Sequence, residues 1–589
     1  MHLLLYPLIL LSSFPLYQAV NLCPGYAPDP ELDGACIGSN FDGVLNQYNA
    51  TIEAIHRVNE TLPCYGEDTY DNIFYNSIFG NCSFTDSARR FDGSCNYALL
   101  LPPSCAMIVK KDTYRFGLIM PKADSYNGSF MATGGFSYAG GINWREMWAG
   151  AFYYGMAVMS TDQGHRSNQT DMSWARNNDT ARKDWGYRAL DGSVPVAKSL
   201  INRYYGADAR HSYFAGCSTS GRQGLKQLEV DQSAFDGLLI GAPAWDQEHM
   251  LPWITKLAVI DPPNSTGNIP VDFNQAIFIT EGIRNGCDGK DGAADGVIMD
   301  PAVCDIREVA NANLRCRTAT NSRYCLNDTQ IDTLVAVHQN YTVTENNGNS
   351  RTVFPGPEPG AEYNLFTAYL GAEQRTPRTG FDWQWEIDFL DYPDNYTYND
   401  QIVIDAENRR PGNASPRANE TDWAAFNTRG GKVIMYHGLV DGIVPTDSSL
   451  DYFNQVGEAS AQRDDFMLYY RVPGMAHCFL SDSYIVNVNI SGVPPQLLQF
   501  RAPWFFSGAT QGSTAYGNNV STDIFAALVN WVEKPDQKPK DIIATTWNAT
   551  TAAQTIFAQR PICPFPKTAH YIEGVSNDTT SWNCSLPLA

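Results

Sequence analysis

The chain has 589 residues, more than a single typical hydrophobic core holds, so we expect one large domain that carries an insertion. Its formal net charge of −22 argues against nucleic-acid binding, which needs a basic surface. After the N-terminal segment no run of about 20 apolar residues follows, so we expect a soluble mature protein that does not insert into a membrane.

The N-terminus has the pattern of a secretory signal peptide. An apolar run over 3–11 is too short to serve as a membrane anchor, and Tyr17-Gln18-Ala19 resembles a cleavage site, which predicts a signal peptide over 1–19. Secretion also agrees with 14 cysteines, an even number, and with many Asn-x-Ser/Thr sequons, which predict a glycoprotein. These sequons include Asn49, Asn59, Asn81, Asn127, Asn168, Asn178, Asn264, Asn327, Asn340 and Asn395.

A cysteine-rich leader follows the signal peptide. We expect its six cysteines to pair among themselves, and the sequence does not choose among the possible connectivities. They are Cys23, Cys36, Cys64, Cys82, Cys95 and Cys105.

Short apolar runs then alternate with a helical pattern over Val194–Tyr205. This alternation predicts a parallel α/β sheet. The predicted strands are Tyr114–Pro121, Gly155–Thr161, Ser212–Gly216, Leu238–Pro243, Lys432–Gly438 and Met467–Tyr470.

The stretch 244–419 interrupts this alternation with an Asp/Gly loop, two cysteine pairs and an aromatic cluster from Phe381 to Tyr392. We interpret it as an inserted lid domain over a core built from 20–243 and 420–589. The aromatic cluster favours a lid core over a platform for substrate, because aromatic residues at this spacing are more often buried.

A serine nucleophile is predicted in the segment Gly216-Cys217-Ser218-Thr219-Ser220-Gly221. A serine on a tight strand-to-helix turn points into solvent at the carboxyl edge of the sheet, and small residues are needed two positions before and after it. Gly216 and Ser220 occupy those positions. An ordinary Ser/Gly turn is the alternative, and it loses weight only if partners for Ser218 exist.

His477 is the predicted base and Asp441 the predicted acid. In hydrolases with this turn the order along the chain is serine, acid, histidine, and both residues follow late strands in that order. Asp447 is the second candidate for the acid. His437 is interpreted as a loop histidine that shapes the turn.

The cysteines beside Ser218 and His477 strengthen this assignment. Cys217 precedes the serine and Cys478 follows the histidine. If serine and base meet, their neighbours lie within disulfide range, so we expect a Cys217–Cys478 bridge that ties the two loops together.

Together, Cys217-Ser218, Asp441 and His477-Cys478 resemble the paired-cysteine triad of the fungal tannase and feruloyl esterase family. The likeness extends to the blocks Thr161–His165, Asp184–Arg188, Phe235–Ala244 and Arg429–Lys432, and covers about 114–584. The resemblance implies an α/β-hydrolase core with an inserted lid. The chain departs from the family at Ser220 and around 133–136, where members carry more glycine.

The oxyanion of the reaction needs backbone donors. Thr219, which directly follows the nucleophile, is the first expected donor. Gly134, or else Gly135, is the expected second donor.

The loop Cys287–Val297 brings together three carboxylates, which a hard cation would relieve of their repulsion. A solvated acidic turn is the alternative from composition. The loop resembles the calcium site of the family, which implies Asp288, Asp291 and Asp295 as side-chain ligands and the carbonyl oxygens of Ala293 and Val297, around a structural ion. The expected bridges nearby and in the tail are Cys287–Cys304, Cys316–Cys325 and Cys563–Cys584.

The sequence thus predicts a secreted carboxylic ester hydrolase that needs no organic cofactor. The resemblance implies aromatic acyl esters as substrates, with feruloyl esters of plant cell-wall polysaccharide favoured and galloyl esters of tannins as the alternative. A non-catalytic secreted glycoprotein of the same fold is a third possibility, against which the intact serine, acid and histidine argue.

Overall fold

The structure is a computed structural model that describes residues 34–58, 103–262, 265–269, 272–317, 324–344, 348–370, 383–409, 423–478, 519–548, 555–576 and 578–586. The predicted signal peptide and the cysteines at positions 23, 64, 82 and 95 lie outside these ranges.

A nine-stranded sheet forms the centre of the fold. The five pairs from β5 to β11 are parallel, whereas β1, β2, β3 and β5 pair antiparallel. The predicted mostly parallel α/β sheet is therefore confirmed, with an antiparallel edge added. In spatial order the strands are β1 (Ala50–Val58), β2 (Ser104–Lys111), β3 (Tyr114–Pro121), β5 (Ala157–Thr161), β4 (Ser129–Thr133), β6 (His211–Cys217), β7 (Gly237–Gly241), β10 (Lys432–Gly438) and β11 (Met467–Val472).

Helices bury both faces of this sheet. On one face α4 (Trp144–Tyr154) and α17 (Ile524–Glu533) pack against the strands, through side chains such as Met147 and Trp531. The other face is covered by α6 (Ala189–Tyr205), α7 (Thr219–Val230) and α15 (Thr446–Ala459). Because the central strands are apolar on both sides, they read as continuous hydrophobic runs in the sequence.

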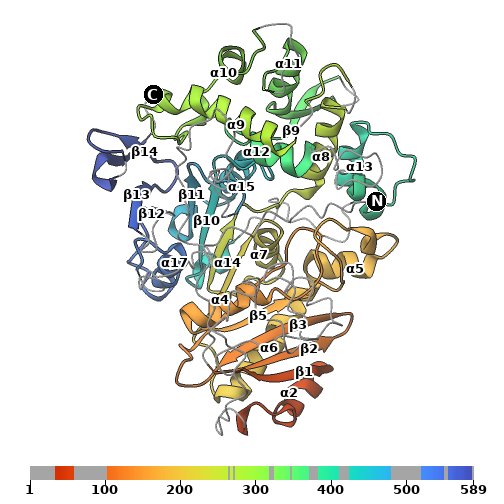
Figure 1. Cartoon of the computed structure of the whole chain (residues 1–589). Coiled ribbons are helices and arrows are strands. Elements are labelled where there is room, and N and C mark those ends of the chain that lie inside the picture. Colours follow the sequence, from red (N-terminus) through yellow and green to blue (C-terminus); the bar gives the residue numbers. More distant parts are fainter. Residues whose placement is uncertain are drawn as a thin grey trace, which may run out of the picture.

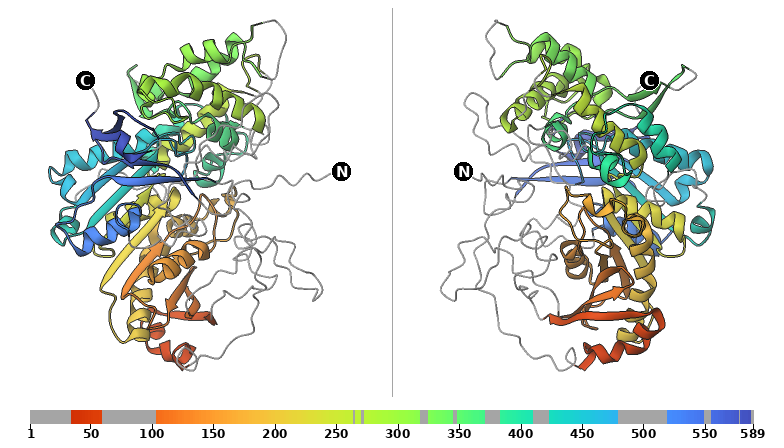
Figure 2. Two further views of the ribbon diagram at one scale, coloured as in Figure 1. Left: turned by 60° about the vertical axis from the view of Figure 1, so that its left-hand side comes forward. Right: turned by 90° about the vertical axis from the view of Figure 1, so that its right-hand side faces the viewer.

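The segment between β7 and β10 builds a group of helices around one hydrophobic cluster, to which Tyr138, Met172 and Trp185 from before β6 also belong. Figure 1 shows these helices, coloured green, at the opposite end of the molecule from β1, and both views of Figure 2 agree. They are α8 (Gln247–Ile260), α9 (Phe273–Cys287), α10 (Ile306–Asn313), α11 (Asp328–Val337), α12 (Glu362–Leu365) and α13 (Gln401–Arg409), with a hairpin of β8 (Tyr341–Thr344) and β9 (Ser350–Phe354). We call this segment the lid.

Two members of the predicted aromatic cluster lie in the lid core. Trp385 and Phe389 are buried and stacked, with ring centroids 4.4 Å apart. Phe389 also contacts Trp185 of the core edge at 5.5 Å, so the cluster joins the lid to the rest of the molecule. Phe381 lies outside the described residues.

Shorter elements connect these parts. They are η1 (Gly38–Phe41), α2 (Asp42–Tyr48), η2 (Ser173–Ala175), α5 (Asp179–Lys183), η3 (Asp184–Arg188), η4 (Asp288–Asp291), η5 (Pro301–Val303), η6 (Phe366–Leu370), η8 (Trp385–Phe389), α14 (Ala424–Thr428), α16 (Arg463–Phe466) and η12 (Thr579–Ser581). No helix in the described ranges is long and apolar enough to cross a membrane.

The C-terminal tail forms two small antiparallel pairs, β12 (Ile542–Asn548) with β13 (Thr555–Ile562) and β14 (Thr568–Tyr571) with β15 (Trp582–Ser585). The disulfide Cys563–Cys584 ties this tail together, and Cys36–Cys105 ties the leader to β2. Within the lid the structure also forms Cys287–Cys304 and Cys316–Cys325.

Candidate active site

Ser218 lies on the turn between β6 and α7, at the carboxyl edge of the sheet. Its backbone has φ 63° and ψ −126°, a conformation that residues other than glycine rarely adopt and that is typical of a nucleophile elbow. The turn is anchored because Ser218 donates its amide to Gly241 at 3.0 Å and its carbonyl accepts from Ala244 at 3.1 Å. Ser218 itself is partly exposed, so a substrate can reach its hydroxyl.

The small residues around the elbow are needed for the close approach of backbone and side chain. A Cβ at Gly216 would lie 2.0 Å from Ser220 Oγ, so no larger residue fits there. Ser220 in turn accepts a hydrogen bond from the Gly134 amide at 2.9 Å. Serine in place of the usual glycine at this position thus supplies a hydroxyl that accepts a hydrogen bond from the loop after β4.

His477 and Asp441 are in direct contact. His477 Nδ1 lies 2.7 Å from Asp441 Oδ2, and both side chains are buried. Asp447, the other candidate acid, instead pairs with Arg471 Nη2 at 3.2 Å. The structure therefore brings Asp441, and not Asp447, to the candidate base.

The two loops that carry acid and base are joined by their backbones. Leu439 donates to Val472 at 2.9 Å, and Val440 donates to Met475 at 3.1 Å. A Cβ at Gly438 would lie 2.0 Å from the Met475 carbonyl oxygen, which explains why the chain turns on a glycine at this point.

Asp441 is held in its charged form. Complete burial raises its pKa. The nearby His477 and hydrogen bonds from His437 and His477 lower it by more than burial raises it, so the pKa lies well below its ordinary range. Its Oδ1 accepts the amides of Ile443 at 2.8 Å and Val444 at 2.9 Å. A permanent carboxylate at this position is what a histidine base requires for its orientation.

The disulfide Cys217–Cys478 joins the serine turn to the histidine loop, with a Cα–Cα distance of 5.7 Å. It places Ser218 and His477 next to the two bridged residues. No hydrogen bond links the Ser218 hydroxyl to His477, both of which the structure describes. Catalytic hydrogen bonds are often long without substrate and tighten when substrate binds.

The candidate oxyanion donors differ in whether their backbone amides are already hydrogen-bonded. Thr219 starts α7, and no acceptor among the described residues receives its amide. The amides of Gly134 and Gly135 are already engaged, by Ser220 Oγ and by Gln223 Oε1 at 3.1 Å. Either glycine would have to exchange this bond in order to serve as the second donor.

His437 shapes the turn after β10, as the sequence predicts, because its Nε2 lies 2.8 Å from the Val444 carbonyl oxygen. The sequence did not reveal that its fully buried ring also lies 2.9 Å from Asp441 Oδ2. The spacing of four residues between His437 and Asp441 was the available signal, but only the loop conformation brings the two side chains together.

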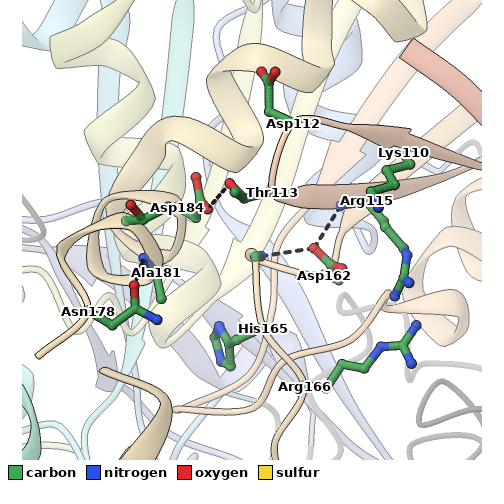
Figure 3. A pocket seen from close by; sticks show the side chains of 12 residues that line it. Lys110, Asp112, Thr113, Arg115, Asp162, His165, Arg166, Asn178, Ala181 and Asp184 are labelled. Carbon is green, nitrogen blue, oxygen red and sulfur yellow. Dashed lines mark hydrogen bonds between the residues drawn. The ribbon is translucent and has the colours of Figure 1, made fainter. Parts of the chain in front are cut away.

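A polar cavity of about 530 Å³ lies at the same edge of the sheet, beside β5, which is two strands from β6 (Figure 3). It is lined by the turn after β5, with Asp162 and His165, and by η3, with Asp184. Burial lowers the pKa of His165 to about 4. Asp184 accepts from Thr113 at 2.6 Å, and Asp162 accepts the amide of Arg115 at 2.9 Å. The blocks Thr161–His165 and Asp184–Arg188 therefore both hold the β2–β3 turn.

The Asp/Gly loop is held by hydrogen bonds from its own backbone amides to the Asp288 carboxylate. Asp288 Oδ1 accepts the amides of Asp295, Gly296 and Val297, at 2.9–3.1 Å, and Asp295 pairs with Arg560 of the tail. The oxygen atoms of Asp288, Asp291 and Asp295 do not all lie within 4.8 Å of one another, as they would around a metal ion. In the described ranges, the one group of three ligand-type atoms within 4.8 Å is Asp541 with the disulfide-bonded Cys563 and Cys584.

Comparisons with known proteins identify the family of this chain. The family model for tannase and feruloyl esterase matches residues 105–585. The probable feruloyl esterase B-1 of Aspergillus oryzae is 28% identical over 472 residues, covering 78% of this chain and 79% of that protein. Feruloyl esterase C of Talaromyces stipitatus is 28% identical over 478 residues, covering 79% and 81%.

Solved structures extend the likeness to the fold. The crystal structure of feruloyl esterase B from Aspergillus oryzae matches with a TM-score of 0.73 and 25% identity, covering 94% of this chain and 100% of that one. Tannin acyl hydrolase from Aspergillus niger matches with a TM-score of 0.66 and 18% identity, covering 94% and 95%, which supports the fold alone.

The chain belongs to the tannase and feruloyl esterase family, with the α/β-hydrolase fold. It is a carboxylic ester hydrolase.

Proposed function

We propose that this protein is a secreted serine esterase that hydrolyses hydroxycinnamoyl esters, such as feruloyl esters of plant cell-wall polysaccharide. The observation that carries the proposal is the 2.7 Å contact of His477 with Asp441, on a loop that a disulfide ties to the Ser218 elbow. This arrangement has the parts that acyl transfer through a serine requires.

The chemistry follows from the hydrogen bonds. His477 Nδ1–H donates to Asp441, which leaves the Nε2 lone pair to accept the proton of Ser218. Ser218 Oγ attacks the ester carbonyl carbon, and the Thr219 amide stabilises the oxyanion. His477 then passes the proton to the leaving alcohol. Water, deprotonated by His477, then attacks the acyl carbon. The bond from that carbon to Ser218 Oγ breaks, His477 returns the proton to Oγ, and the acid is released.

The acyl group is proposed from the relatives. The curated relatives from Aspergillus oryzae and Talaromyces stipitatus are named feruloyl esterases, which favours a hydroxycinnamoyl group. The family model covers tannases as well as feruloyl esterases, which keeps galloyl esters of tannins as the second candidate.

The two candidates are separated by rates on methyl ferulate, methyl caffeate and methyl gallate with the purified protein. We expect kcat/KM to be highest for a hydroxycinnamate and lowest for the gallate. A preference for methyl gallate would make the protein a tannase. No hydrolysis of any ester by folded protein would contradict the esterase proposal.

Secretion and glycosylation are proposed from the sequence pattern and agree with the exposure of the sequons. Of the ten sequon asparagines named above, seven lie in the described ranges, and these seven are exposed: Asn49, Asn127, Asn168, Asn178, Asn327, Asn340 and Asn395. Disulfides throughout the described chain suit an oxidising compartment. Expression in a eukaryotic host should give protein in the medium that begins after residue 19 and loses mass with an endoglycosidase.

We further propose a structural calcium ion at the Asp/Gly loop. Asp295 Oδ1 is buried without a hydrogen-bond partner, and burial raises the pKa of Asp291 to about 6. The carbonyl oxygens of Ala293 and Val297 accept no hydrogen bond from described residues. Asp288, Asp291 and Asp295 would hold the ion with these two carbonyls, since calcium takes oxygen ligands. When bound, the ion would neutralise carboxylates that Arg560 balances only in part.

The calcium proposal predicts an effect on stability rather than on chemistry. A chelator should lower the melting temperature, and calcium, but not magnesium, should restore it. Asp288→Asn should abolish this response. Unchanged melting in chelator, with no calcium found by elemental analysis, would contradict the site.

A further inference from the structure

His437 closes the carboxyl end of β10, and its side chain is completely buried. Its Nε2 lies 2.9 Å from Asp441 Oδ2 and 2.8 Å from the Val444 carbonyl oxygen, and its Nδ1 lies 2.8 Å from Ser449 Oγ on α15. Every polar atom of the ring therefore has a partner within the protein.

These partners define the tautomer of the ring. A carbonyl oxygen can only accept, so the proton must sit on Nε2, which faces Val444 and Asp441. Nδ1 then carries a lone pair, and the Ser449 hydroxyl donates to it. A neutral His437 satisfies all three contacts.

Asp441 consequently receives four donors. Its Oδ1 accepts two backbone amides, and its Oδ2 accepts His477 Nδ1–H and His437 Nε2–H. Four is the capacity of a carboxylate, so neither oxygen can turn without losing a bond. The imidazole of His477 and that of His437 share the same oxygen.

Other charged groups lie on or near the strand beside His437. Arg471 is its register partner on β11, and Arg471 Nη2 lies 3.2 Å from Asp447 and 3.5 Å from Glu358, whose pKa burial raises to about 7. His437 makes its hydrogen bonds to Asp441, Val444 and Ser449 rather than to these three residues, so a change at His437 acts first on Asp441 and on His477, which shares the same Asp441 oxygen.

We propose that His437 is a positioning residue that fixes the Asp441 carboxylate and sets the pH at which His477 becomes an effective base. This inference rests on the proposed serine esterase function. His437 N–H stabilises the negative charge of Asp441, and so weakens its hold on a proton at His477. Without that donor, the charge on Asp441 acts more strongly on His477, and the histidine keeps its proton to a higher pH.

Two substitutions separate this role from a general loss of structure. Asparagine places its amide near the Nδ1 position, whereas glutamine reaches the Nε2 position. His437→Asn should therefore lose the donor to Asp441, and His437→Gln should keep it. Ser449→Ala removes the hydroxyl that donates to His437 Nδ1 and should give a smaller effect in the same direction.

The test is the pH profile of kcat/KM, recorded on methyl ferulate for protein shown to be folded by circular dichroism. For His437→Asn we expect kcat to fall on the order of tenfold to a hundredfold, with KM unchanged because the ring is sealed from substrate. The acid limb should move up by about one pH unit, the size of one lost hydrogen bond to a charged group. His437→Gln should restore much of kcat and the wild-type limb.

A wild-type acid limb in folded His437→Asn would overturn the proposal, as would an equal loss of kcat in the Asn and Gln variants. If neither variant folds, Ser449→Ala decides, and an unshifted limb there would also overturn it. A wild-type protein without esterase activity would instead contradict the proposed function, before any variant is compared.

Discussion

Single residues around Ser218 are fixed by contacts that only small or specific side chains allow. Ser220 is one of them, because its hydroxyl accepts the Gly134 amide at 2.9 Å in a buried position. This bond connects the helix that follows the nucleophile to the loop after β4, from which the second oxyanion donor is expected.

Ser220→Ala should destabilise the fold. The Gly134 amide would lose its acceptor while remaining buried, which costs about 1–3 kcal/mol. Urea unfolding followed by fluorescence measures this loss. Ser233→Ala, which removes an exposed hydroxyl, is the control and should change the free energy of unfolding very little. Equal stability of Ser220→Ala and wild type would contradict the role of the hydroxyl.

The residues of the triad could be proposed from the sequence because order along the chain and adjacent cysteines constrain them. The partner of His437 could not, since a histidine four residues before an acid has no fixed geometry in a loop. The hydrogen bond between Gly134 and Ser220 was likewise hidden, because it joins a loop to a helix 86 residues further along the chain.

At the level of helices and strands, the sequence predicts the centre of the sheet better than its edge. The strand runs in the core were predictable because strands buried on both faces are continuously apolar. The antiparallel edge with β1 and β2 was not, since its pairing depends on segments that show no distinct pattern.

In the lid, helices are held by buried polar groups. Glu386 of η8 is fully buried, and its Oε1 lies 2.8 Å from Thr255 of α8.

Glu386 should make the stability of the lid depend on pH. Burial raises its pKa from 4.5 to about 8 in the folded protein. The folded state thus binds the proton more tightly than the unfolded state. Its contribution is fully present below about pH 4.5 and is lost as the pH rises towards about 8, on the order of a few kcal/mol.

Glu386→Gln should remove this loss, because glutamine stays neutral. Relative to wild type, the variant should gain free energy of unfolding between pH 5 and pH 8, as measured by urea unfolding at both values. The exposed Glu458→Gln serves as control and should follow wild type. A constant difference between Glu386→Gln and wild type across this range would show that Glu386 does not titrate there.

At the scale of the whole molecule, the lid separates Ser218 from Asp441 and His477 along the chain. The Cys217–Cys478 bridge, with a sequence separation of 261 residues, brings these halves together again. The lid also contacts the acid loop, since Tyr369 Oη donates to the Ile443 carbonyl at 2.9 Å. The placement of Ser218 relative to Asp441 and His477 therefore depends on how the two halves of the core and the lid are held.

Replacing both Cys217 and Cys478 by alanine should lower kcat on the order of a hundredfold, because about 1 Å of misplacement between serine and base has this effect. The melting temperature should fall as well, with a loss of up to about 5 kcal/mol from a loop of this length. The matched control is the double alanine variant of Cys563 and Cys584, which should lose stability but keep kcat. Wild-type kcat in the folded Cys217/Cys478 variant would contradict the positioning role.

The central claim is that Ser218 is the nucleophile and that His477 activates it. The direct measurement is covalent labelling with a fluorophosphonate, followed by peptide mass spectrometry. We expect one adduct, on the peptide that contains Ser218. Labelling should be absent in folded Ser218→Ala and much slower in folded His477→Ala. An adduct on a different residue, or full esterase activity in folded Ser218→Ala, would contradict the account.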